Sequence, residues 1–250
     1  MMRRPEGAGQ GARRSVWAGL EFEARRSSGE THQPQINRED STERRQGEMA
    51  AERKSEPKSK PVPKDVRDFM AAQVAAGFES TESILQAAME SFAGDLKSVT
   101  RAGVQIALEK LIDAHKTKQA KWKRPTDCDR LDAAFSKLNE LGLVARQNWT
   151  SCVTDGFEEI AAEMEVNRKA GRKVIGYCFY HSQDTELAVE EGDSDLMLTF
   201  GASVRGTDGA EAVGQTIVRI MEEEGLSTYW KGDPKQRIEV GVNWKKFRKE

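Results

Sequence analysis

The sequence predicts an α+β protein with an α/β-like alternation of elements, preceded by a disordered N-terminal tail. Three observations support this prediction. Residues 1–64 lack a periodic apolar pattern, residues 65–124 carry apolar residues at helical spacing, and residues 125–250 alternate between helical and extended patterns. We therefore expect a helical segment that packs with a four- or five-stranded sheet covered by helices, both forming one compact unit.

Residues 1–64 have the composition of a disordered tail and linker. Arg, Glu, Gly, Ser and Gln dominate it, and the prolines at positions 57, 61 and 63 favour an extended linker. All nine basic residues before Met49 are arginines, whereas lysines occur only after it. Two interpretations of residues 1–48 therefore stay open. They are a functional disordered tail, or they are translated upstream sequence in a protein whose native start is Met49.

Residues 65–124 predict three amphipathic helices. The first has apolar residues at i, i+3, i+4 and i+8 from Val66, which places them on one helix face. The second begins at a capping residue, either Ser80 or Thr81. The third carries an apolar stripe from Val104 to His115.

A basic run follows the third predicted helix. Its members are Lys116, Lys118, Lys121, Lys123 and Arg124. Such a run can contact nucleic acid, but cations are also favoured at a helix C-terminus, and Trp122 is the only aromatic residue among them. Residues 65–250 contain 25 basic and 31 acidic residues, a net charge of -6. We therefore do not expect a nucleic-acid partner.

Residues 125–250 predict the α/β sheet domain. Pro125 breaks the chain, and Thr126-x-x-Asp129 resembles a capping box at the start of a helix that Gly142 ends. The predicted strands are 143–150, 173–181, 196–204, 228–231 and 237–242. The later predicted helices are 157–168, 183–190 and 210–224. The last two strands form a hairpin, and the order of the strands stays open.

Cysteine usage and hydropathy indicate where in the cell the protein is located and which kinds of site it lacks. No run of about 18 apolar residues occurs, so we expect no membrane span. Three cysteines cannot build a disulfide scaffold and fit a reducing compartment, which favours a cytoplasmic location. Because no C-x-x-C pair is present, we expect no metal site, and no motif indicates a cofactor.

Polar residues at the predicted strand ends are the candidate site. If the first three strands are parallel, their carboxyl ends meet at one edge of the sheet, where open α/β proteins bind ligands. The candidate binding residues are Arg146, Asn148, His181, Gln183 and Asp184. Ser151, Ser203 and Arg205 would lie beside them. A local interpretation also stays open, in which Asp184 or Ser182 caps the next helix and His181 is a half-exposed strand end.

These patterns favour a binding or regulatory module for a protein or small ligand, without catalysis. There is no G-x-S-x-G motif, and the stretch 201–206 lacks the ending of a phosphate-binding loop. The alternative is an enzyme that uses the polar site around His181 and Asp184. An enzyme would bring His181 and a second ionisable group together in a concave pocket, whereas a filled or convex surface would favour a binding module.

Several motifs of the sheet domain resemble a known family. They lie in the stretches Thr126–Phe135, Gly142–Trp149, Tyr180–Glu186 and Arg237-Ile238. As a set they resemble a bacterial family, domain-of-unknown-function family 6891, over about residues 65–245. The resemblance implies a bacterial cytoplasmic protein with no assigned activity.

The sequence departs from this family after the first predicted strand. Relatives often carry a cysteine cluster of the form C-C-x-x-C-G there. The matching stretch Ser151–Gly156 keeps only Cys152. Any metal or redox role that the cluster has in relatives is therefore not expected in this chain.

Overall fold

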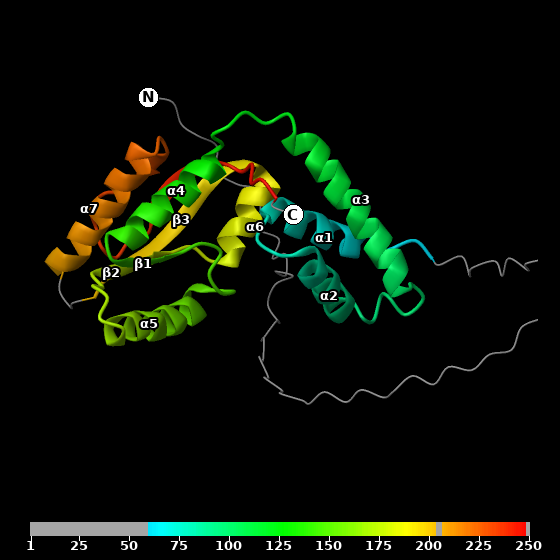
Figure 1. Ribbon diagram of the computed structural model, residues 1–250, viewed down its shortest axis with the longest axis horizontal. Helices are drawn as coiled ribbons and strands as arrows, with labels where there is room; N and C mark the ends of the chain where they lie inside the picture. The colour runs from blue at the N-terminus through cyan, green and yellow to red at the C-terminus, as the bar shows by residue number, and fades with distance from the viewer. Residues whose placement is uncertain (1–59, 204–206, 249–250) are drawn as a thin grey trace, which may run out of the picture.

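The computed structural model describes residues 60–203 and 207–248. Within these ranges lie seven α-helices and one five-stranded sheet, which confirms the predicted α+β class and its helical lead-in (Figure 1). Most of the predicted tail and linker, residues 1–64, and the hypothesis of a native start at Met49 concern residues outside these ranges. The end of the predicted linker is ordered, since Val62 packs into the helical core and Lys64 begins the first helix. No helix of the described ranges is both long and apolar enough to cross a membrane.

The helical segment contains three helices. They are α1 (Lys64–Ala76), α2 (Thr81–Ser91) and α3 (Arg101–Gln119). Gly77 takes a left-handed conformation with φ of 77° and ends α1, while the side chains of Ser80 and Thr100 cap α2 and α3 by accepting backbone N–H groups. Their facing sides form a separate apolar core in which Met70 and Leu108 are fully buried.

The sheet has the strand order β1-β2-β3-β5-β4. Its strands are β1 (Leu143–Arg146), β2 (Gly176–Phe179), β3 (Asp193–Ala202), β4 (Ser227–Tyr229) and β5 (Ile238–Asn243). The first half of β3 pairs with β5 and its second half pairs with β2, so this strand joins the two halves of the sheet. The number of strands agrees with the prediction, although β1 and β2 are shorter than predicted.

The expectation that the first three strands are parallel is wrong for β3. β1 and β2 are parallel, but β3 runs antiparallel to β2. The chain leaves β2 into α6 (Ser182–Glu191), which packs on β3, and Gly192 with φ of 76° turns it back. The end of β3 therefore lies at the opposite edge, because Ala202 pairs with Gly176. Ser203 is thus far from the other candidates, and Arg205 falls outside the described ranges.

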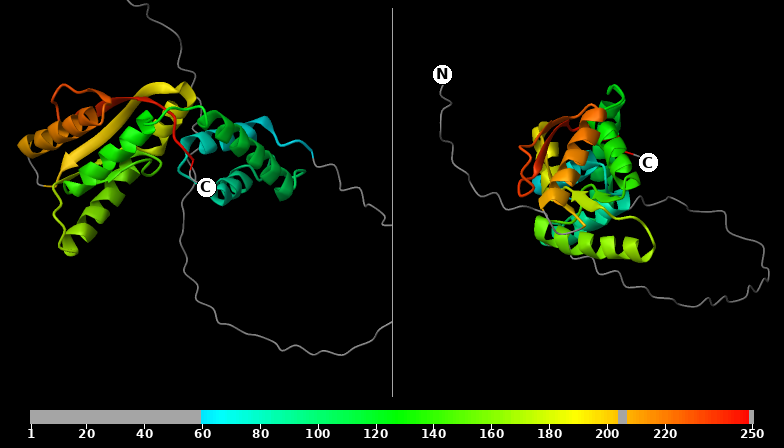
Figure 2. Two further views of the ribbon diagram at one scale, coloured as in Figure 1. Left: turned by 45° about the horizontal axis from the view of Figure 1, so that its top comes forward. Right: turned by 90° about the vertical axis from the view of Figure 1, so that its left-hand side faces the viewer.

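Helices cover both faces of the sheet. They are α4 (Asp127–Glu140) and α7 (Thr207–Glu223) on one face and α5 (Val153–Lys169) on the other (Figure 2). Strand alternation explains this arrangement. Leu143 and Ala145 join the core beneath α4 and α7, whereas Val144 between them joins the core beneath α5.

A C-terminal segment, residues 244–248, connects the sheet to the helical segment. Trp244 is buried and its Nε1 donates to the carbonyl of Ala75, 3.0 Å away. The Lys246 carbonyl lies 3.3 Å from Nε2 of His115, and the backbone N–H of Arg248 donates to Gln119. The helical segment therefore packs beside one end of the sheet, and the last residues of the chain run between the two (Figure 1).

Candidate functional site

The loops after β1 and β2 lie side by side, as their parallel pairing requires. The backbone N–H of Trp149 donates to the carbonyl of Tyr180 over 2.8 Å, and that of Ser182 donates to Thr150 over 3.1 Å. This strand-end edge is where the sequence predicted a site. Only two of the three predicted strand ends contribute to it, because β3 runs the other way.

His181 and Asp184 form the cap of α6 at this edge. Nδ1 of His181 accepts the backbone N–H of Asp184 at 3.3 Å, and Oδ2 of Asp184 accepts the backbone N–H of His181 at 3.1 Å. The same Asp184 oxygen accepts a hydrogen bond from Nη2 of Arg237 at 2.6 Å. Both capping side chains are buried, with exposed fractions of 7% and 6%. We call these three residues the capping cluster.

The electrostatics of the capping cluster favour a neutral imidazole. Burial lowers the pKa of His181, against the opposing effect of Asp184. Because Nδ1 accepts a hydrogen bond, the ring proton lies on Nε2. A general base needs a free lone pair beside space for a substrate. Here the available lone pair is used inside the protein, so the cluster fixes the start of α6.

The other sequence-predicted residues point elsewhere. Arg146 pairs with Glu163 of α5, its Nε lying 2.9 Å from Oε2, and donates to Asn139 of α4. Asn148 has a left-handed backbone with φ of 51° and a buried Oδ1 without a hydrogen-bond partner. Gln183 is half-buried in the first turn of α6. Of the five candidates, the structure joins only His181 and Asp184 by hydrogen bonds.

The three cysteines of the chain are free thiols. Cys128 and Cys178 are buried, and Cys152 is half-buried. Burial raises the pKa of Cys128 to about 12, so its thiol stays protonated at neutral pH. Across the described ranges, no three His, Cys, Asp or Glu side chains gather as metal ligands.

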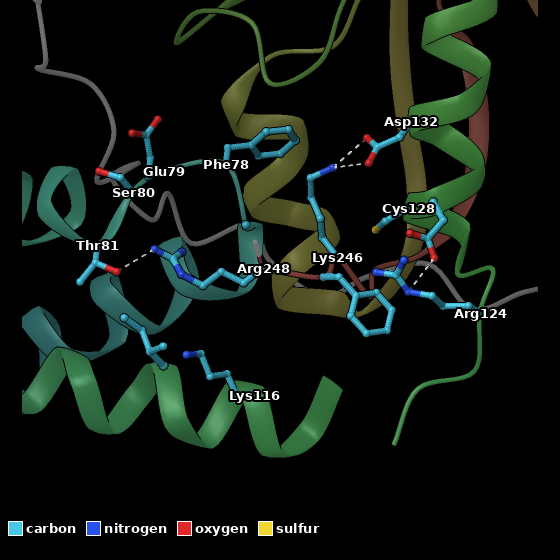
Figure 3. Close-up of a pocket in the computed structure, with 14 residues that line it drawn as sticks. Phe78, Glu79, Ser80, Thr81, Lys116, Arg124, Cys128, Asp132, Lys246 and Arg248 are labelled. Carbon is cyan, nitrogen blue, oxygen red and sulfur yellow. Dashed lines mark hydrogen bonds and ion pairs between the residues drawn. The ribbon is translucent and has the colours of Figure 1, made fainter. Parts of the chain in front are cut away.

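A cavity of about 780 Å³ lies between the helical segment and the sheet (Figure 3). We call it the junction cavity. Its walls come from the loop after α1, from α3, from the start of α4 and from the C-terminal segment. The residues that line it are Gly77, Phe78, Glu79, Ser80, Thr81, Ile112, Lys116, Arg124, Cys128, Asp129, Asp132, Lys246, Phe247 and Arg248. Neither His181 nor Asp184 is among them.

Charges on the sheet side of the junction cavity are paired. Nζ of Lys246 lies 2.8 and 3.1 Å from the two carboxylate oxygens of Asp132. Arg124 lies over the ring of Phe247 at 3.9 Å, and its Nε is 3.9 Å from Asp129. The Asp132 carboxylate also accepts from Gln147, which in turn accepts from the buried Tyr180 hydroxyl. These pairs neutralise one another.

The helical side of the junction cavity is different. Nη2 of Arg248 donates to the Thr81 hydroxyl over a long 3.4 Å, and its Nη1 is buried with no hydrogen-bond partner. Burial lowers the pKa of Arg248, while Glu79 acts in the opposite direction. Lys116 lines the same end, as Figure 3 shows. This end therefore holds a guanidinium whose donors are incompletely used.

The sequence pattern did not point to this cavity. Asp132 and Lys246 pair across 114 positions, and Arg248 lies beyond the last predicted strand. One signal was present after β5. Trp244 and Phe247 alternate there with basic residues, which indicates a C-terminus that packs on the protein rather than one that frays.

A comparison with known protein families identifies the family of this chain. The model of a family described as a domain of unknown function (DUF6891) matches residues 59–248. This span includes the helical segment, the sheet and every residue that lines the junction cavity. No curated protein and no solved structure matches the chain.

Proposed function

The chain belongs to the DUF6891 family, and we propose that it is a non-catalytic binding or regulatory module that holds a small ligand in the junction cavity. The observation that carries this proposal is the cavity itself. Its volume of about 780 Å³ falls within the range of roughly 300–1,000 Å³ that small-molecule sites occupy. Its walls belong to both parts of the fold.

The chemistry of the walls supports binding without catalysis. Phe78, Ile112 and Phe247 supply apolar surface, while a few charged groups can orient a ligand. The one thiol in the cavity, that of Cys128, is held protonated and is a poor nucleophile. We therefore assign the cavity a recognition role.

The position of the junction cavity supports a regulatory role. The loop at Gly77–Thr81 belongs to the helical segment, whereas Asp132 belongs to the sheet domain. A ligand that contacts both parts would stabilise the arrangement in which they are held together. Binding would then change how firmly the two parts pack, which a partner protein could sense.

An enzyme acting at His181 and Asp184 receives less support. The two residues do meet within hydrogen-bond distance, which is the arrangement expected of a catalytic pair. They are buried, however, they satisfy each other in a helix cap, and they do not line the junction cavity. Catalysis at this edge would need α6 to move before a substrate could reach either group.

We propose that the protein acts in the bacterial cytoplasm on a small-molecule partner. A bacterial cytoplasmic location is consistent with the family resemblance and with three free cysteines. A small ligand is favoured over nucleic acid because residues 65–250 carry a net charge of -6. A membrane partner is not proposed.

A thermal-shift screen of the full chain tests the proposal. The library contains sugars, sugar phosphates, amino acids and dicarboxylates, and each hit is repeated on two variants. Thr81→Trp places a large side chain at the cavity wall, whereas His181→Asn keeps a capping residue at the strand-end edge. We expect hits that Thr81→Trp abolishes and His181→Asn retains. The reverse pattern would contradict the proposal and support the enzyme.

A further inference from the structure

The three arginine and lysine side chains that the C-terminal segment and the loop before α4 bring to the junction cavity differ in how they are paired. Lys246 meets Asp132 at 2.8 Å, and Arg124 faces Asp129 and the ring of Phe247. Arg248 has only a long contact to the Thr81 hydroxyl, and its Nη1 is shielded from solvent without a hydrogen-bond partner. The unused hydrogen-bonding capacity of the cavity is therefore concentrated at Arg248.

An unpartnered buried guanidinium donor is costly for a protein. A buried polar group without a hydrogen bond loses its hydration and gains nothing in return, and the loss is larger for a charged group. The guanidinium presents N–H donors in a planar fork that matches the two oxygens of a carboxylate or phosphate. Arg248 lines the cavity, so an oxyanion bound there would supply the missing acceptor once the guanidinium turns Nη1 toward it.

The surroundings of Arg248 favour a negative charge as well. Lys116 lines the same end of the cavity and adds a second cation. The first turn of α2, an eleven-residue helix, begins there at Thr81 and directs its positive end toward this region. Glu79 is the carboxylate at this end, and it is exposed at the surface. Toward the other end, the Lys246–Asp132 pair offers both donors and acceptors to a neutral polar group.

We propose that Arg248 anchors the phosphate or carboxylate group of a small organic anion at the Thr81 end of the junction cavity, with the polar body of the ligand extending toward Lys246 and Asp132. This assignment rests on the proposed function and specifies the ligand class for the same cavity. The shared chemistry is an oxyanion with two acceptor oxygens on a hydroxylated body.

Calorimetric titrations of the full chain at constant ionic strength test this assignment. Three probes share one sugar body: glucose 6-phosphate, glucuronate and glucose. We expect at least one of the two anions to bind about tenfold more tightly than glucose, which is the scale of one charge-assisted hydrogen-bond pair. The comparison between the two anions identifies phosphate or carboxylate as the preferred group.

Two Arg248 variants and one control test whether the charge of Arg248 is the one that contributes to anion binding. Arg248→Gln removes the charge and should weaken anion binding about tenfold while leaving glucose unchanged. Arg248→Lys keeps the charge but loses the fork, so an intermediate affinity is expected. Lys245→Gln removes the same charge from an exposed neighbour outside the cavity lining and should change the affinity less than about twofold.

Three outcomes would overturn the assignment. They are equal affinity for glucose and both anions, equal losses in Arg248→Gln and Lys245→Gln, and no binding of any probe. A different result would be that neutral compounds bind, that Thr81→Trp blocks their binding and that Arg248→Gln leaves it unchanged. In that case the anion assignment fails while the small-ligand function stands. If Thr81→Trp blocks no ligand of any class, the proposed function fails as well.

Discussion

The capping cluster and the junction cavity are both rich in charged groups, yet they differ in whether those groups border space for a ligand. In the capping cluster, hydrogen bonds join His181, Asp184 and Arg237, and although Nε of Arg237 is buried without a partner, none of the three residues lines the junction cavity. In the junction cavity, Arg248 also has an unpartnered buried nitrogen, but this residue lines open volume. The comparison teaches that unused hydrogen-bonding capacity indicates a ligand site only where the residue that carries it borders open space.

The two regions also differ in how the chain assembles them. The cap of α6 is formed by residues three positions apart, so it is complete within one helical turn. The junction cavity needs the loop after α1, the start of α4 and the C-terminal segment to meet. A ligand there contacts parts of the chain that only the folded protein brings together.

The largest effect is expected from Asp184→Ala in the capping cluster. This change removes the cap of α6 and leaves Arg237 without its carboxylate partner. Breaking a buried pair costs about 3–5 kcal/mol, so we expect a loss near the lower limit of this range, about 3 kcal/mol, because Arg237 is partly exposed. Urea unfolding followed by circular dichroism measures the free energy of unfolding.

Asp129→Ala is the matched control, since Asp129 occupies the same position in the capping box of α4 but is more exposed. Loss of a cap alone costs about 1 kcal/mol. Equal losses in the two variants would contradict the buried role of Asp184.

A smaller effect is expected from Glu186→Gln on α6. Burial, with Glu190 nearby, raises the pKa of Glu186 to about 7, so the folded protein holds this proton more tightly than the unfolded chain does. The stability that this group contributes is present below pH 4.5 and is lost as the pH rises through 7. The free energy of unfolding of the variant should therefore exceed that of the parent protein by about 1 kcal/mol at pH 8, allowing for partial solvent screening. The difference should be smaller at pH 5.

Unfolding free energies of the two proteins at pH 5 and pH 8 check this prediction. Glu186 has a buried oxygen without a hydrogen-bond partner and lies outside the junction cavity. The result therefore shows what an unpartnered buried group does to stability where no ligand cavity is present. A difference that does not vary with pH would show that Glu186 ionises normally in the folded protein.

His181 gives the protein an acid-sensitive component. Its pKa is lowered by burial below the ordinary value of 6.5, so the unfolded chain binds this proton more readily than the folded protein. Stability is therefore present above pH 6.5 and is lost as the pH falls below it, by at most about 1.4 kcal/mol per pH unit. His181→Asn keeps a good capping residue and should flatten this part of the stability curve.

Unfolding titrations between pH 5 and pH 7 measure the slope. The pKa of His115, beside the C-terminal segment, is lowered by burial as well, so His115→Gln serves as the comparison from the other region. A slope for His181→Asn identical to that of the parent would mean that the imidazole is not buried as described.

The smallest change in stability is expected from Arg248→Gln. This substitution removes a partly buried cation whose side-chain hydrogen bond, to the Thr81 hydroxyl, is a long 3.4 Å, so we expect the free energy of unfolding to stay within about 0.5 kcal/mol of that of the parent protein. Urea unfolding is again the measurement. A loss of about 2 kcal/mol would place Arg248 among the structural residues and remove the contrast with Asp184.

Much of the fold could be predicted from the sequence because its elements have local signals. Ser80 caps α2 and the Thr126–Asp129 box caps α4, as the sequence indicated. The direction of β3 could not be predicted, because it depends on how α6 packs and where Gly192 turns the chain. Apolar alternation specifies which residues of a strand are buried, and it does not specify which neighbour the strand pairs with.

Part of the candidate site could also be predicted from the sequence and part could not. The sequence placed His181 and Asp184 together at a strand end, and the local interpretation correctly expected Asp184 to take part in a helix cap. It was wrong about His181, which is the buried N-cap residue rather than a half-exposed strand end. Arg248 could not be found in this manner. Its surroundings come from α2 and α3, more than 120 positions earlier, and its unpartnered nitrogen is a property of packing that no spacing pattern carries.

The most direct test of the account is an amide chemical-shift map of the full chain titrated with glucose 6-phosphate. We expect the shifted amides to cluster around the junction cavity, at Gly77, Thr81, Lys246 and Arg248. We also expect the amide shifts of His181 and Gln183 to stay unchanged. Shifts concentrated at His181 and Gln183, with the cavity amides unchanged, would contradict the account and return the site to the strand-end edge.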